Sequence, residues 1–133
     1  MKLTRRPSDS EILSALEAWI DQLAEGEFGH ALSGIRVEPD MAWSPQALEA
    51  VIAGYGLPEA HPSGKRFRVT PRSEARGGPP RVAIDRVTVP PDALAYAEHD
   101  LPLNGSWSDL TACFVIRATH TGSELVLQDV HVL

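Results

Sequence analysis

The sequence predicts an α+β fold in which N-terminal helices pack on a curved, mainly antiparallel sheet that ends in a long C-terminal hairpin. Three observations support this prediction. Apolar residues in the first half of the chain recur at the three- and four-residue spacing of amphipathic helices. Apolar residues in the second half alternate with polar ones, as in half-buried strands. The final segment, 104–133, reads as two long strands joined by one tight turn.

A chain of 133 residues with 43% hydrophobic residues is large enough to bury a core without disulfides or a metal. We therefore expect a single domain, 1–133, with a helical part at about 8–56 and a sheet part at about 66–133. The chain contains one cysteine, and neither a signal peptide nor a stretch able to span a bilayer is visible. These features predict a cytoplasmic protein without a membrane partner.

The first helix has clear start and stop signals. Ser8 with Glu11 three residues later forms a capping-box pattern, and Gly26 suits the left-handed residue that ends a helix. The residues between them that recur at helical spacing are Ile12, Leu16, Trp19, Ile20 and Leu23. A helical turn at 28–32 and a short strand at 34–37 are expected to follow.

A second helix is predicted to begin at Ser44 and Pro45, a cap followed by proline at the first helical position, and to end at Gly56 and Pro58. Beyond it, 66–70 alternates as a strand with arginines on its outer side. The next strand, 82–89, shifts its apolar phase at 85–86, which suggests a β-bulge. Residues 93–98 are predicted to form a short helix.

The register of the C-terminal hairpin decides which side chains share a side of the sheet. A three-residue loop at 121–123 pairs His120 with Glu124 and places every valine of the last strand beside Phe114. Asp129 and His131 then share the opposite side with Asp109, Thr111 and Cys113. A two- or four-residue loop would reverse this arrangement. We prefer the three-residue loop because it separates polar from apolar residues better.

Charge is unevenly distributed along the chain. The segment 65–86, called the basic arm below, contains seven cationic and two anionic residues, so its net charge is +5 and the rest of the chain carries −11. The acidic body argues against nucleic acid as a partner, because phosphate neutralisation supplies most of that affinity. The basic arm could either bind an anionic partner or protect a sheet edge from aggregation.

The order of elements resembles the cone-shaped α+β roll of the nuclear-transport-factor-two-like superfamily, whose members often begin with a helix running into a segment like 23–28 (LAEGEF). The segments 102–111 (PLNGSWSDLT) and 127–133 (LQDVHVL) also resemble a small bacterial family of unknown function. The second resemblance implies no activity. The first implies a concave pocket, and enzymes of that superfamily such as ketosteroid isomerase use pocket carboxylates there.

Asp109, Asp129 and His131 are therefore the candidates for acid–base chemistry, since a carboxylate near an imidazole can transfer protons at neutral pH. The alternative is that they are polar residues on a half-exposed sheet. Trp107 and Arg117 join these three as candidate binding residues, because tryptophan and arginine are frequent in binding hot spots.

No cofactor or metal is predicted. The glycine pairs do not form a phosphate-binding loop, and the spacing of His99, Asp100, Asp129 and His131 is not that of a zinc site. Cys113 is interpreted as a packed residue rather than a nucleophile. The leading hypothesis is a small binding protein rather than an enzyme, of an immunity or accessory type, that binds a basic partner protein. The rival hypothesis is a roll-type small-molecule binder or enzyme, and formation of a homodimer stays open.

Overall fold

The computed structural model describes residues 2–38, 40, 41, 43–57 and 59–133 and confirms the α+β class. The helices are α1 (Asp9–Ala24), α2 (Phe28–Ser33), α3 (Pro45–Ala53) and the 3₁₀ helix η1 (Arg72–Glu74). The strands are β1 (Lys2–Leu3), β2 (Arg36–Val37), β3 (Val82–Asp85), β4 (Ala93–Leu103), β5 (Ser106–Ala118) and β6 (Ser123–Val132). The predicted helical turn at 28–32 and short strand at 34–37 correspond to α2 and β2.

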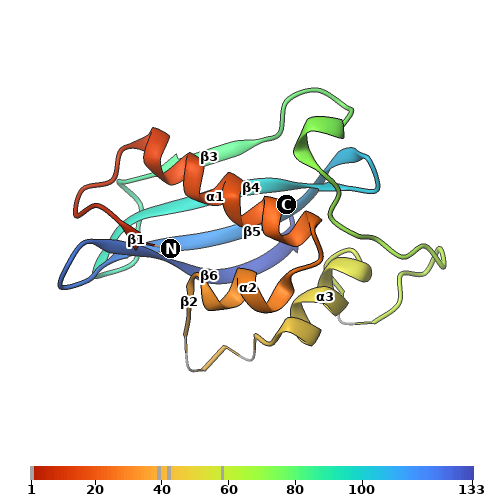
Figure 1. Cartoon of the computed structure of the whole chain (residues 1–133), viewed down its shortest axis with the longest axis horizontal. Coiled ribbons are helices and arrows are strands. Elements are labelled where there is room, and N and C mark those ends of the chain that lie inside the picture. The colour runs from red at the N-terminus through yellow and green to blue at the C-terminus, as the bar shows by residue number, and fades with distance from the viewer. Residues whose placement is uncertain (1, 39, 42, 58) are drawn as a thin grey trace.

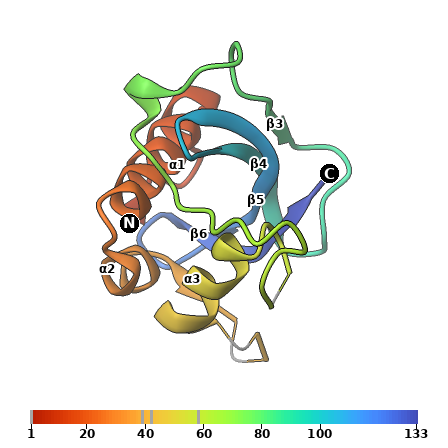
Figure 2. The same cartoon turned by 90° about the vertical axis from the view of Figure 1, so that its right-hand side faces the viewer.

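The strands form one curled sheet in the order β1-β6-β5-β4-β3, and β2 adds to β6 in parallel (Figure 1). Figure 2 shows β4 and β5 arching over α1, so the helices occupy the concave side of the sheet. The core lies between them. The indole of Trp19 in α1 meets the ring of Phe114 in β5 edge to face, with centroids 5.0 Å apart, and its Nε1 donates to the Ala31 carbonyl of α2 at 3.0 Å.

Both predicted helix starts are confirmed. The Ser8 hydroxyl accepts a hydrogen bond from the amide of Glu11 at 3.1 Å, and the Ser44 hydroxyl caps α3 in the same way. The Glu11 carboxylate accepts hydrogen bonds from the amide and hydroxyl of Thr4, both at 2.7 Å, and so ties α1 to β1. Gly26 adopts the predicted left-handed conformation with φ of 76°. Helix α3 ends at Ala53, earlier than the predicted stop at Gly56, and Pro58, the second predicted stop signal, lies outside the described residues.

Two predictions for the middle of the chain are wrong. Residues 66–70 make only an isolated bridge between Val69 and Leu103, and the predicted helix at 93–98 is part of β4. The turn that joins β4 to β5 is Asn104–Gly105, with φ of 51° and 87° between the paired residues Leu103 and Ser106. Positive φ at both central residues is the requirement of the tight hairpin turn that Asn-Gly favours.

The predicted bulge at 85–86 is also wrong, because β3 ends there. The Asp85 carboxylate accepts hydrogen bonds from the amides of Val87 and Thr88 at 2.8 and 3.1 Å, which turns the chain out of the sheet. Val87 is consequently 92% exposed. β3 is a four-residue strand that pairs only with β4 among the described residues.

The predicted register of the C-terminal hairpin is wrong in its details. Ala118 pairs with Ser123, which leaves the four-residue loop 119–122. The pairing then shifts by one residue at Gln128, so that Cys113 lies opposite Asp129. The four-residue loop and the bulge reverse the strand phase twice. Asp129 and His131 therefore lie on the side opposite Phe114, as expected, although they pair with Cys113 and Thr111 and not with Val115 and Cys113, the partners that pairing His120 with Glu124 would give.

The four-residue loop also changes which side chains of β6 face the core between the loop and the bulge. Leu125 and Leu127 lie opposite Ile116 and Phe114 and join the core, whereas Val126 pairs with Val115 on the other side. The expectation that every valine of β6 lies beside Phe114 is therefore wrong for Val126.

Candidate functional site

Asp129 and His131 lie on the outer side of the sheet, which we define as the side that carries Cys113 and faces away from the helices. The His131 Nδ1 atom is 2.9 Å from a carboxylate oxygen of Asp129 and 3.9 Å from the Cys113 sulfur. The side chains of His131 and Asp129 are 39% and 55% exposed. These two residues therefore do not line a cavity between the sheet and the helices.

This cluster is poorly arranged for nucleophilic catalysis. In a relay, one ring nitrogen of the histidine faces the nucleophile and the other is held by the carboxylate. Here both close contacts involve Nδ1. Burial also raises the pKa of the Cys113 thiol to about 11, so the thiolate form is disfavoured. The geometry agrees with Cys113 being a packed residue, 1% exposed.

Asp109 lies apart from Asp129 and His131 and contacts Tyr55. Its carboxylate accepts a hydrogen bond from the hydroxyl of Tyr55, just beyond α3. Burial, together with the hydrogen bond to Asp109, raises the pKa of the Tyr55 hydroxyl. The Tyr55 ring packs on Phe67 and His61, with centroid distances of 4.8 and 6.1 Å, and its φ of 56° is unusual for a bulky residue. Asp109 thus anchors the segment after α3 to the sheet.

The side chain of Arg117 contacts other parts of the protein. Its Nε atom lies 3.3 Å from the Glu38 carboxylate, and a terminal nitrogen donates to the Pro91 carbonyl at 3.4 Å. This ion pair joins β5 to the segment after β2.

Trp107 lines a depression of about 530 Å³ together with residues of α1 and the basic arm. Three carboxylates line this acidic depression, from Glu17, Asp21 and Glu25. The ring of the buried His99 lies 5.9 Å from the Trp107 indole, and its Nδ1 contacts the Asp100 carbonyl at 2.6 Å. Since a carbonyl oxygen only accepts, Nδ1 carries the proton. Burial lowers the pKa of His99 and favours the neutral ring.

Most of the ion pairs of the basic arm hold it against the acidic body. Arg72 donates to both carboxylate oxygens of Asp21 at 2.8 and 3.0 Å and to Glu17 at 2.9 Å. Two further arginines pair similarly, Arg81 with Glu98 at 3.1 Å and Arg86 with Asp9 at 2.7 Å. These three arginines therefore attach the basic arm to the body.

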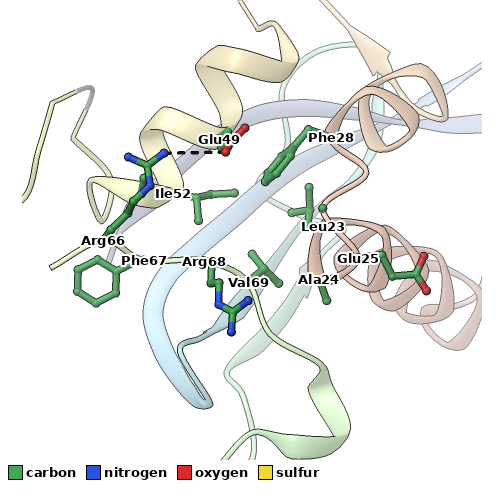
Figure 3. A pocket seen from close by; sticks show the side chains of 12 residues that line it. Leu23, Ala24, Glu25, Phe28, Glu49, Ile52, Arg66, Phe67, Arg68 and Val69 are labelled. Atoms are coloured by element: carbon green, nitrogen blue, oxygen red, sulfur yellow. Dashed lines mark ion pairs between the residues drawn. The ribbon is translucent and has the colours of Figure 1, made fainter.

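The cavity that best fits a ligand lies where α1 ends, α2 and α3 meet, and the chain passes through 66–69 (Figure 3). We call it the end cavity. Its volume is about 410 Å³. Core side chains form its floor, since Leu23, Ile52 and Val69 are at most 4% exposed. The other apolar side chains that line it are Ala24, Phe28, Ala53 and Phe67.

Charged side chains surround the apolar floor of the end cavity. Arg66 and Arg68 lie on one side of the floor and Glu25 on the other (Figure 3). The Arg66 guanidinium lies 3.9 Å from the Glu49 carboxylate, and these side chains are 77% and 55% exposed. An exposed pair at that distance contributes little to stability. Nothing in the sequence indicated this cavity, because its lining comes from three separate segments of the chain, 23–28, 49–53 and 66–69.

Among the described residues, no group of three or more histidine, cysteine or acidic side chains is arranged to hold a metal ion. No helix in the described part of the chain is long and apolar enough to cross a bilayer. Comparison with known proteins found no matching family model, curated protein or solved structure.

Proposed function

We propose that this chain is a binding protein whose end cavity receives the apolar part of a small amphipathic ligand. The observation that carries the proposal is an apolar floor made of core side chains within a cavity of about 410 Å³. Ligand pockets typically measure about 300–1,000 Å³ and combine an apolar lining with a few polar groups. The charged side chains at the rim, Arg66, Arg68, Glu25 and Glu49, supply such groups.

Binding is favoured over acid–base catalysis because of where the titratable groups lie. Asp129 and His131 are on the outer side of the sheet, and Asp109 is bonded to Tyr55. A general base must lie within hydrogen-bond reach of the proton it removes from a bound substrate. None of these three residues lines the end cavity.

The proposal is tested by filling the cavity. Ala24 lines it from the last turn of α1, whereas Ala18 is exposed on the same helix. The neutral fluorophore N-phenylnaphthylamine should bind the wild-type protein saturably. Ala24→Phe should abolish binding and the matched control Ala18→Phe should retain it. Fluorescence titrations in which Ala24→Phe, folded by circular dichroism, binds as well as wild type would refute the end cavity as the site.

A second function, binding of a basic partner protein, is favoured by the acidic depression. Its wall combines Trp107 with the carboxylates of Glu17, Asp21 and Glu25, of which the first two are already bonded to Arg72. Cross-linking in a native extract, followed by identification of the captured protein, tests this function. The double variant Glu25→Lys, Trp107→Ala should lose that protein while Arg76→Gln keeps it. Equal capture by both variants would exclude this surface.

A further inference from the structure

We infer that the ligand of the end cavity carries an anionic head group, a carboxylate or a phosphate, that binds to Arg66 and Arg68. This inference rests on the function proposed above and adds the chemical class of the ligand. The charge of the head group follows from the ion pairs of the arginines in the basic arm and from the side of the cavity on which Arg66 and Arg68 lie. The length of the apolar part follows from the volume of the cavity.

The first group of arginines already has close partners. Arg72, Arg81 and Arg86 each lie within 3.1 Å of a carboxylate of the body. In contrast, Arg66 reaches only Glu49, at 3.9 Å, and no ion pair of Arg68 or Arg76 is found among the described residues. Of these three weakly engaged arginines, Arg66 and Arg68 line the end cavity. Guanidinium groups match carboxylate and phosphate oxygens in geometry as well as in charge.

The position of the acidic rim residues is consistent with this assignment. Glu25 lies across the apolar floor from Arg66 and Arg68, so a head group on the arginine side is separated from it (Figure 3). Glu49 is on the arginine side, but its contact with Arg66 is long and exposed. An incoming anion can therefore replace Glu49 as the partner of Arg66 at little cost.

The cavity volume limits the apolar part of the ligand. About 410 Å³ lies near the lower end of the range of about 300–1,000 Å³ that is typical of small-molecule pockets. An eight-carbon chain with a small head group fits this space. Octanoate, octanol and octylamine therefore form a matched probe series in which the chain is constant and the charge of the head group changes.

Binding of the three probes is followed by NMR, using the amide signals of Ala24, Gly26 and Ala53, which line the cavity. Octanoate should bind about threefold to tenfold more tightly than octanol, and octylamine most weakly. Arg68→Gln should remove most of this preference without weakening octanol binding. Glu49→Gln should strengthen octanoate binding about twofold, because it removes a like charge. Arg76→Gln, the same charge change outside the cavity, should have no effect.

The results of these titrations distinguish a wrong head-group charge from a wrong binding site. Equal affinity for octanoate and octanol, unchanged in Arg68→Gln, would overturn the anionic head group and leave the end cavity as a binding site. Tightest binding of octylamine, weakened in Glu25→Gln, would overturn it in favour of a cation. If none of the three probes shifts the cavity signals, both the inference and the proposed function fail.

Discussion

Replacement of Phe114 by alanine should lower the free energy of unfolding by about 3–5 kcal/mol. Phe114 is fully buried at the centre of the sheet, opposite Ala97 in β4 and Leu127 in β6. Loss of about 150 Å² of buried apolar surface at about 25 cal/mol per Å² corresponds to about 4 kcal/mol. The edge-to-face contact with Trp19 adds about 0.5–1.5 kcal/mol, and compactness of the unfolded chain reduces the total.

Urea unfolding followed by tryptophan fluorescence measures this change as a lower midpoint with an unchanged slope. Val87→Ala is the matched control, because Val87 is 92% exposed and its truncation should change stability by less than about 0.5 kcal/mol. A loss below about 1.5 kcal/mol for Phe114→Ala would contradict the packing of α1 on β5. It would mean that the helix does not cover this part of the sheet.

Three further predictions follow from local geometry. Gly122→Ala should destabilise by about 1–3 kcal/mol in urea unfolding, because the new Cβ would lie 2.2 Å from the Leu3 carbonyl oxygen, whereas Gly29→Ala has open space and should not destabilise. Burial lowers the pKa of His99 below the usual value for histidine, about 6.5, so the unfolded chain takes up the proton first and stability should fall as the pH drops below about 6.5. That slope should flatten in His99→Gln, and an unchanged slope would contradict the assignment. Cys113, whose pKa burial raises to about 11, should react with Ellman's reagent at neutral pH only after unfolding.

Local signals predicted the helices well because each helix end depends on neighbouring residues. The hydroxyls of Ser8 and Ser44 cap the two longer helices, and Gly26 takes the left-handed conformation that ends the first. The apolar stripe between Ser8 and Gly26 faces the sheet, as its spacing predicted. The information needed for these elements lies within about one helical turn of each residue.

The error at 93–98 shows where local preference fails. Three alanines in this segment favour a helix by propensity, yet Ala95 and Ala97 lie in β4 and are fully buried against its neighbours. β4 pairs with β5 along most of its length, and this pairing outweighs the helix propensity of the three alanines. The sequence Asn104–Gly105 is typical of a hairpin turn, and reading it as one would have predicted a strand before it in place of the helix.

The hairpin shows why register is harder to predict than strand content. A four-residue loop alone would have placed Asp129 on the same side of the sheet as Phe114. The extra residue Gln128 restores the phase for Asp129 and His131, but Val126 and Leu127 lie before it and keep the register set by the four-residue loop, which puts Leu127 instead of Val126 in the core. No residue type near the bulge marks it, because the bulge satisfies the packing of both ends of β6 at once.

The candidate site was beyond sequence prediction for a related reason. The net charge of +5 on the basic arm is visible in the sequence, but it does not distinguish one arginine from another. That distinction depends on which carboxylates of α1 and β4 the folded arm reaches. Arg72 meets Asp21 across 51 residues of sequence, whereas Arg68 lies beside the apolar floor of the end cavity without a close carboxylate among the described residues. An arginine that stabilises the fold and an arginine available to a ligand have the same side chain, and only the packing of the arm against the body separates them.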